Sequence, residues 1–195
     1  GPIICHRFKR ALSKPYAGGH MGVTHTDAGA LEFLESKGAN SLLDVGCGPG
    51  GQVHAALERG WGAFGIDVDV SLLEDQGPPN VAIIDLADQP VIFHKRFDVV
   101  WSVEVAEHIP EKFEDNYVTT LVENCAKYLV LTASNIPMPL HFNCKPKEYW
   151  IQRIEKEDLN YSEYLLQQLL AKSTMKREFL QETGMVFYRS SFPAI

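Results

Sequence analysis

The sequence predicts an α/β protein whose central sheet is mostly parallel and is covered by helices on both faces. Three observations carry this prediction. Short apolar runs alternate with helix-like segments, a glycine-rich turn joins the first run to a helix, and no internal repeat breaks the order. Alternating strands and helices favour right-handed crossovers, which place parallel strands side by side beneath helices.

The glycine-rich turn follows a predicted strand, LLDV at residues 42–45, and precedes a predicted helix, QVHAALER at residues 52–59. Gly46, Gly48 and Gly50 leave this turn almost without side chains. A strand, a bare turn and a helix N-terminus bring backbone N–H groups close to a ligand. The turn is therefore the first candidate for a binding site.

Two kinds of nucleotide-like ligand fit this turn. Gly46, Gly48 and Gly51 have the spacing G-x-G-x-x-G, and Asp67 follows at about the 20 residues expected of a dinucleotide-binding acid. The same stretch also satisfies D-x-G-x-G-x-G, beginning at Asp44. An acid at that position repels a pyrophosphate but attracts the ammonium and sulfonium charges of S-adenosylmethionine. The charge therefore favours S-adenosylmethionine, with a nicotinamide-dependent dehydrogenase as the alternative.

With this motif the chain resembles the class I S-adenosylmethionine-dependent methyltransferases, whose first motif commonly reads (E/D)xGxGxG. The resemblance covers about residues 25–190 and implies a Rossmann-like fold with an antiparallel strand near the C-terminus. It divides the chain into an N-terminal arm or lid, residues 1–24, and a methyltransferase domain, residues 25–195. It also implies S-adenosylmethionine as the cofactor and methyl transfer to an oxygen or nitrogen acceptor.

The remaining strands are expected in the order of that family. After the first strand, strand-like runs lie within residues 61–69, 81–88 and 129–135, residues 97–110 hold the fourth strand and the loop after it, and the antiparallel strand lies within residues 184–190. A sixth parallel strand has room only at residues 159–161, which departs from the family's fuller pattern.

The helices between them are predicted from caps and apolar spacing. They are expected at residues 28–36, 111–128, 146–158 and 161–173, and residues 70–80 leave room for little more than two turns. Asp27 or Thr26 is a suitable N-cap for the first of these helices. Phe113, Tyr117 and Leu121, followed by Cys125, predict one apolar face on the second.

The resemblance assigns residues to the cofactor. It places Asp67 at the ribose hydroxyls and Asp85 beside the adenine amino group. The other expected cofactor residues are Asp44, Gly46, Cys47, Gly48, Gly50, Val68, Leu86, Ser102 and Val103. Because the carboxyl ends of parallel strands meet at one edge of a sheet, a single crevice can collect the acids.

The chemistry is expected after the fourth strand, in EVAEH at residues 104–108. If this stretch begins a helix, Glu104, Glu107 and His108 share one face. Two carboxylates and an imidazole can hold a divalent metal, Mg²⁺ being favoured by oxygen ligands and Mn²⁺ or Zn²⁺ by the imidazole. His141 could supply a fourth ligand. Glu104 and His108 are the expected catalytic residues, and His108 could act as a general base without a metal.

The E-x-x-E-H motif itself resembles two groups within the family. These are the ubiquinone-biosynthesis O-methyltransferases, which act on catechol hydroxyls, and the small-RNA methyltransferases, which modify a terminal ribose 2′-hydroxyl. In both, the motif is associated with a divalent metal that orients adjacent oxygens. The alternative is that Glu104 faces the methionine end of the cofactor while Glu107 and His108 fix the loop. The segment HFNCKPKEYW, residues 141–150, resembles one in small phage-type methyltransferases.

His25, His141 and Asn143 are the residues expected to bind the acceptor. Composition limits what that acceptor can be. A net charge of −7 argues against coating nucleic acid by bulk electrostatics. The expected acceptor is a small molecule or a nucleic-acid end. No apolar run approaches the roughly 18 residues that span a bilayer, so no membrane segment is expected. Four cysteines without C-x-x-C spacing favour free thiols in the cytoplasm.

Overall fold

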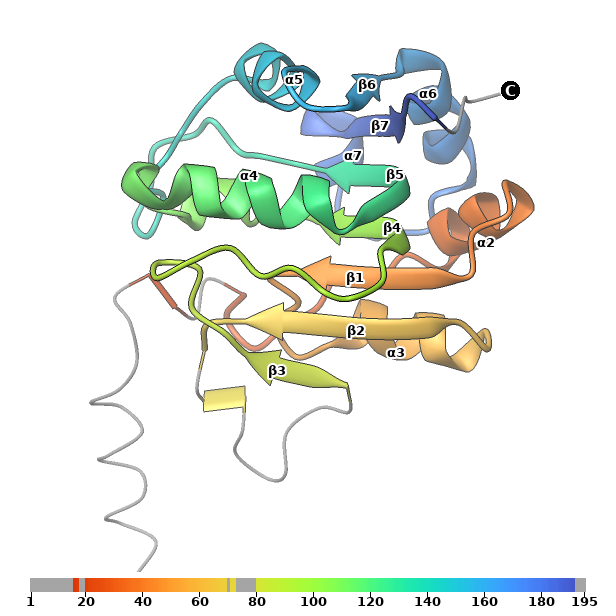
Figure 1. Cartoon of the computed structure of the whole chain (residues 1–195), viewed down its shortest axis with the longest axis horizontal. Coiled ribbons are helices and arrows are strands. Elements are labelled where there is room, and N and C mark those ends of the chain that lie inside the picture. Colours follow the sequence, from red (N-terminus) through yellow and green to blue (C-terminus); the bar gives the residue numbers. More distant parts are fainter. Residues whose placement is uncertain (1–15, 18–19, 70, 73–79, 192–195) are drawn as a thin grey trace, which may run out of the picture.

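The computed structural model describes residues 16–17, 20–69, 71–72 and 80–191 (Figure 1). Within these residues one sheet has the strand order β3-β2-β1-β4-β5-β7-β6. The strands are β1 (Ser41–Val45), β2 (Gly62–Asp67), β3 (Val81–Ile83), β4 (Phe97–Ser102), β5 (Cys125–Leu131), β6 (Leu159–Tyr161) and β7 (Met185–Arg189). The α/β class predicted from the sequence is confirmed.

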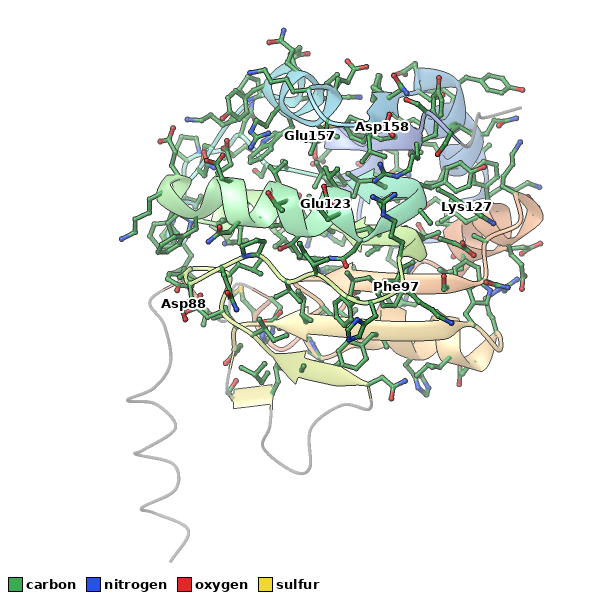
Figure 2. All side chains as sticks on the ribbon, viewed as in Figure 1. Asp88, Phe97, Glu123, Lys127, Glu157 and Asp158 are labelled. Carbon is green, nitrogen blue, oxygen red and sulfur yellow. The ribbon has the colours of Figure 1, made fainter. Side chains whose placement is uncertain are left out.

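Helices cover both faces of the sheet, as predicted. They are α2 (Ala28–Ser36), α3 (Gly51–Glu58), α4 (Glu114–Glu123), α5 (Lys147–Glu155), α6 (Glu163–Lys172) and α7 (Phe179–Thr183), with 3₁₀ turns η2 (Ala106–His108) and η3 (Glu111–Phe113). One apolar core lies between the sheet and α2, α3 and α6, and a second lies between the sheet and α4 and α5. Figure 2 shows charged side chains such as Glu123, Glu157 and Asp158 at the outer surface.

The direction of the strands agrees with the prediction. β1 to β5 pair in parallel, and β7 pairs with β5 in the antiparallel sense. The short β6 is antiparallel to β7, so it runs in the same direction as the first five strands. β6 is therefore the sixth parallel strand in direction, although its ladder partner is the antiparallel β7.

The largest boundary differences from the prediction are at the end of α4 and the start of β5. The helix expected over residues 111–128 ends at Glu123, and β5 begins at Cys125 rather than at residue 129. Asn124 explains the stop, because its side-chain amide donates to the Val91 and Thr120 carbonyls and its oxygen accepts from the Phe93 N–H. Cys125 is buried as the first residue of β5 and not on the apolar face of the helix. Its spacing from Leu121 matched a helical repeat by coincidence. Most of the helix expected at residues 70–80 lies outside the described residues.

Asp27 shows why α2 begins where it does. Its carboxylate accepts from the Ala30 N–H at 2.9 Å, the N-cap geometry that the sequence predicts. The same carboxylate accepts from the Thr174 N–H at 2.9 Å and from the Ser173 hydroxyl. Asp27 is fully buried, so one side chain both caps α2 and fixes the segment after α6. No helix in the described part of the chain is long and apolar enough to cross a bilayer.

Candidate active site

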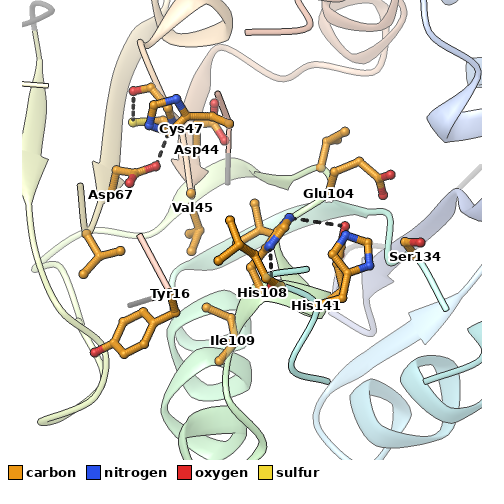
Figure 3. Close-up of a pocket in the computed structure, with 18 of the residues that line it drawn as sticks. Tyr16, Asp44, Val45, Cys47, Asp67, Glu104, His108, Ile109, Ser134 and His141 are labelled. Carbon is orange, nitrogen blue, oxygen red and sulfur yellow. Dashed lines mark hydrogen bonds and ion pairs between the residues drawn. The ribbon is translucent and has the colours of Figure 1, made fainter. Parts of the chain in front are cut away.

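A cavity of about 830 Å³ lies at the carboxyl ends of β1, β2 and β4 (Figure 3). At one end it is lined by Asp44, Cys47 and Asp67, which follow or end the first two strands. At the other end it is lined by His108 and His141, which face one another in Figure 3. The cavity therefore joins the glycine turn to the E-x-x-E-H segment, as expected at the edge where parallel strands end.

The glycine turn depends on backbone that only glycine adopts easily. Gly46, Gly48 and Gly50 have φ angles of 78°, 51° and 87°. A Cβ on Gly46 would lie 2.4 Å from a methyl group of Val105. Side chains are thus excluded from the floor of the cavity, and the turn exposes backbone there.

Asp44 is the buried acid beside this turn. Only 4% of the residue is exposed, and it lines the cavity. Burial, and then the nearby carboxylate of Asp67, raise the pKa of Asp44 well above its usual value. A bound cation would offset both effects, whereas an anion would add to them.

Asp67 is held in position by the backbone. Its carboxylate accepts from the Gly48 N–H at 2.8 Å and from the Asp69 N–H at 3.0 Å. The neighbouring Cys47 is buried, and burial raises the pKa of its thiol, so it remains protonated. Cys47 fills space beside Gly65 rather than acting as a nucleophile.

Residues before α2 lie over the end of the cavity that contains the glycine turn. Tyr16 donates its hydroxyl to both oxygens of Asp85 at 2.9 Å. His20 lies 2.9 Å from Asp69, and a Cβ on Gly48 would lie 3.0 Å from the Cβ of His20. Most of the arm expected at residues 1–24 lies outside the described residues, so its action as a lid stays a prediction.

The E-x-x-E-H segment differs from the expected helix. Glu104 has a φ of 57°, and only residues 106–108 form a 3₁₀ turn. The Glu104 N–H donates to the Thr132 hydroxyl oxygen at 2.7 Å, and that hydroxyl donates to the Glu104 carboxylate at 3.0 Å. The expectation that Glu104, Glu107 and His108 share a helical face is therefore wrong, because Thr132 holds Glu104 in a left-handed turn.

Three side chains do converge. Within the described residues, ligand atoms of Glu107, His108 and His141 lie within 4.8 Å of one another, and Glu104 is not part of this group. Glu107 is 1% exposed, and its Oε2 atom has no hydrogen-bond partner among the described residues. Burial, and then the charge of Glu104, raise the pKa of Glu107. A buried oxygen without a partner is costly, and a cation would satisfy it.

The two imidazoles are held in one tautomer. His108 Nδ1 lies 2.8 Å from the Leu140 carbonyl oxygen, and His141 Nδ1 lies 2.7 Å from the Ile136 carbonyl oxygen. A carbonyl only accepts, so each Nδ1 carries a proton, and in a neutral ring Nε2 then keeps its lone pair. Burial lowers the pKa of His108, which favours this neutral form. Two imidazole nitrogens and a carboxylate oxygen fit a divalent transition metal.

The other predicted residues divide into two groups. Val68, Asp85, Leu86, Val103 and His25 line the cavity together with the residues described above. Gly50, Ser102 and Asn143 are absent from its lining. Ser102 is buried behind the wall and donates to the Val45 carbonyl at 2.9 Å. Asn143 is 2% exposed, and its amide donates to Glu114, so its side chain is turned away from the cavity.

Several lining residues were not predicted from the sequence. They are Tyr16, Met21, Val23, Ile136, Met138, Leu140, Arg177, Phe179 and Glu182. They come from loops and from α7, far from the motifs along the chain. The segment SNIPMPL at residues 134–140 could have been recognised as a lining loop from its sequence. Two prolines there predict a loop, and three large apolar residues follow the end of a strand, where a ligand cavity is expected.

Comparison with known proteins agrees with this geometry. Residues 43–130 match a family described as Methyltransferase domain. The chloroplastic tocopherol O-methyltransferase of Arabidopsis thaliana is 32% identical over 97 residues, covering 44% of this chain and 27% of that protein. The chain thus spans about a quarter of the length of this relative.

Two solved structures have a similar fold. The magnesium protoporphyrin IX methyltransferase of Synechocystis PCC 6803 with bound S-adenosylmethionine has a TM-score of 0.56 at 15% identity, covering 82% of this chain and 76% of that one. A TehB-like S-adenosylmethionine-dependent methyltransferase of Corynebacterium glutamicum has a TM-score of 0.56 at 13% identity, covering 96% and 95%. Residues 43–130 are thus similar to a methyltransferase domain, and the sheet has the topology of the class I S-adenosylmethionine-dependent methyltransferase fold.

Proposed function

We propose that the protein transfers a methyl group from S-adenosylmethionine to an oxygen or nitrogen atom of a small molecule. One observation carries the choice of cofactor. Asp44 is a buried acid beside the left-handed glycine turn, and its pKa is raised by burial and by Asp67. Such a position suits the ammonium group of the cofactor's amino-acid end and disfavours a pyrophosphate.

The other cofactor contacts follow from the strand ends. Asp67 is fixed by backbone N–H groups and would bind the ribose hydroxyls. Asp85, at the next strand end, would lie beside the adenine, with Tyr16 covering it. Bound in this way, the cofactor supplies an electrophilic methyl group. The chain itself needs to bring the acceptor into line with that group and to exclude water.

We place a divalent metal at the other end of the cavity. Glu107, His108 and His141 would hold it, because they offer one buried carboxylate oxygen and two Nε2 lone pairs. A metal there would act as a Lewis acid that lowers the pKa of an acceptor hydroxyl. Glu104 is held by Thr132 at the cavity wall, where its carboxylate could accept the acceptor's proton.

The mouth of the cavity favours a small acceptor with an apolar body. Of eight large apolar side chains exposed in the described chain, five line this cavity: Met21, Val23, Ile136, Met138 and Leu140. An apolar molecule that covered them would gain about 25 cal/mol for each Å² removed from water. The tocopherol O-methyltransferase and the protoporphyrin methyltransferase are named for small-molecule substrates, which agrees with this choice.

Calorimetric titration of the protein with S-adenosylhomocysteine and with NAD tests the cofactor. We expect binding of S-adenosylhomocysteine only, and binding of NAD alone would refute the assignment. The acceptor is sought by incubating the protein with methyl-labelled S-adenosylmethionine and a fractionated cell extract, with Mg²⁺, Mn²⁺ or a chelator. We expect label in small, organic-extractable metabolites and less of it with the chelator. Label confined to RNA or protein would contradict the acceptor class.

A further inference from the structure

Glu114, at the start of α4, is a buried carboxylate outside the cavity. Its Oε1 atom accepts from the Asn143 side-chain amide at 2.9 Å, and its Oε2 atom accepts from the Tyr149 hydroxyl at 2.5 Å. Arg153 Nε lies 3.8 Å from Oε2. Three side chains from beyond β5 therefore meet on one carboxylate of α4.

The phenol of Tyr149 acts as a donor in this group. Burial, and then its hydrogen bond to Glu114, raise the pKa of Tyr149 to about 12, so the hydroxyl keeps its proton. Hydrogen bonds to an ionised, buried acceptor are stronger than those between neutral groups. The carboxylate of Glu114 thus ties α5 and the loop before it to the start of α4.

The same loop is tied to the E-x-x-E-H turn by its backbone. The Glu107 carbonyl oxygen accepts from the Phe142 N–H at 2.8 Å and from the Asn143 N–H at 3.0 Å. In return, His108 Nδ1 donates to the Leu140 carbonyl at 2.8 Å. Three hydrogen bonds therefore clamp the loop that carries His141 against the turn that carries the other two converging side chains.

Asn143 joins the two sets of bonds. Its backbone N–H donates to the Glu107 carbonyl and its side-chain amide donates to the Glu114 carboxylate. A rotation of the loop that moved His141 away from His108 would strain both of these hydrogen bonds. Partners that orient metal-binding side chains commonly change metal affinity by about 10- to 100-fold when they are removed.

We propose that Glu114 and Asn143 are positioning residues, which hold His141 at metal-binding distance from Glu107 and His108 without touching the metal. This inference rests on the metal site proposed above. On this inference Asn143 holds the loop that carries His141, whereas the sequence suggested that Asn143 binds the acceptor.

The test uses two matched substitutions of glutamate by glutamine. Glu114→Gln removes the charge from the buried group. Glu111→Gln removes it from an exposed pair, because Glu111 lies 3.1 Å from Lys145 Nζ and its side chain is 69% exposed. The Glu114–Asn143 and Glu111–Lys145 pairs both join the region around the start of α4 to the same loop. The control substitution therefore differs from the test substitution mainly in the burial of the glutamate.

The readout is the affinity for Mn²⁺, measured by titration calorimetry on the protein without cofactor, beside the affinity for S-adenosylhomocysteine. We expect Glu114→Gln to weaken Mn²⁺ binding about tenfold and Glu111→Gln to change it by less than about twofold. Binding of S-adenosylhomocysteine should stay the same in both variants. Saturating Mn²⁺ should restore the turnover of Glu114→Gln, because no residue that touches the acceptor has changed.

Three outcomes would overturn the inference. Mn²⁺ affinity of Glu114→Gln within twofold of the unaltered protein would refute the positioning role. An equal loss in S-adenosylhomocysteine affinity would show a general loss of structure instead. Absence of Mn²⁺ binding to the unaltered protein would remove the metal site and this inference together, while its S-adenosylhomocysteine titration would still judge the methyltransferase assignment. If Glu114→Gln fails to fold, Tyr149→Phe, which removes a single hydroxyl, decides the matter by the same measurement.

Discussion

The imidazole rings of His108 and His141 meet edge-on, with centroids 4.9 Å apart and an interplanar angle of 90°. They lie 33 positions apart in the chain, one after β4 and the other in the loop after β5. Each ring is turned by a backbone carbonyl that binds its Nδ1 atom. This orientation leaves the Nε2 atoms facing the shared site, where His108 Nε2 lies 3.9 Å from Glu107 Oε1.

His108→Ala and His141→Ala should each strongly weaken metal binding while the fold is retained. Each removes one of three converging ligand groups, so Mn²⁺ affinity should fall by about 100-fold or more. Electron paramagnetic resonance of free Mn²⁺ measures this loss. His94→Ala, at an exposed position, is the control and should bind as before. Undiminished Mn²⁺ binding in both ligand variants would place the metal elsewhere.

Asp44→Asn should stabilise the protein without cofactor and weaken cofactor binding. Because the pKa of Asp44 is raised in the folded state, the folded protein binds this proton more tightly than the unfolded chain does. The contribution of Asp44 to wild-type stability therefore falls as pH rises above about 4, the pKa of this carboxyl in the unfolded chain. The variant lacks this loss, so its melting temperature should exceed that of the wild type at pH 7, with the gap closing below pH 4.

The same variant should bind S-adenosylhomocysteine about tenfold more weakly, since a neutral amide replaces the partner of the ammonium group. Asp88→Asn, an exposed acid near Asp85, is the control for both measurements. A variant that melts lower at pH 7, or that binds as tightly as the wild type, would count against the role of Asp44.

Gly46→Ala and Gly60→Ala separate backbone strain from packing. Both glycines have positive φ, 78° and 82°, so each substitution should cost about 1–2 kcal/mol of stability. A Cβ on Gly60 meets nothing within 4 Å, whereas one on Gly46 would press on Val105. Gly46→Ala should therefore lose about 1–3 kcal/mol more in urea denaturation. Equal losses would mean that the turn and Val105 do not pack as described.

Ile136→Ser should raise the KM for an apolar acceptor about fivefold, because it removes apolar surface at the mouth of the cavity. The kcat and the affinity for S-adenosylhomocysteine should stay the same, since neither depends on this rim. Ile92→Ser is a close control, as Ile92 is 61% exposed and Ile136 is 62% exposed, but Ile92 does not line the cavity. Steady-state kinetics measure both variants, and an unchanged KM in Ile136→Ser would argue against apolar recognition.

Local patterns were sufficient to predict much of the fold. Asp27 caps a residue three positions away, and the glycines act through their own backbone angles. Both effects can therefore be predicted from a short stretch of sequence. The end of α4 could not be predicted from the local sequence. Asn124 ends that helix by binding the segment around residues 91–93, which lies about thirty positions earlier.

The sequence alone determined the order of strands and helices, the parallel direction of the first five strands and the positions of the acids at the strand ends. These features follow from apolar periodicity and glycine spacing, which act locally. Only the tertiary structure decided which candidates meet. It brought His141 to His108, turned Glu104 toward Thr132 and turned Asn143 toward Glu114. These outcomes depend on hydrogen bonds between segments about thirty residues apart, and the spacing within a motif does not encode such bonds.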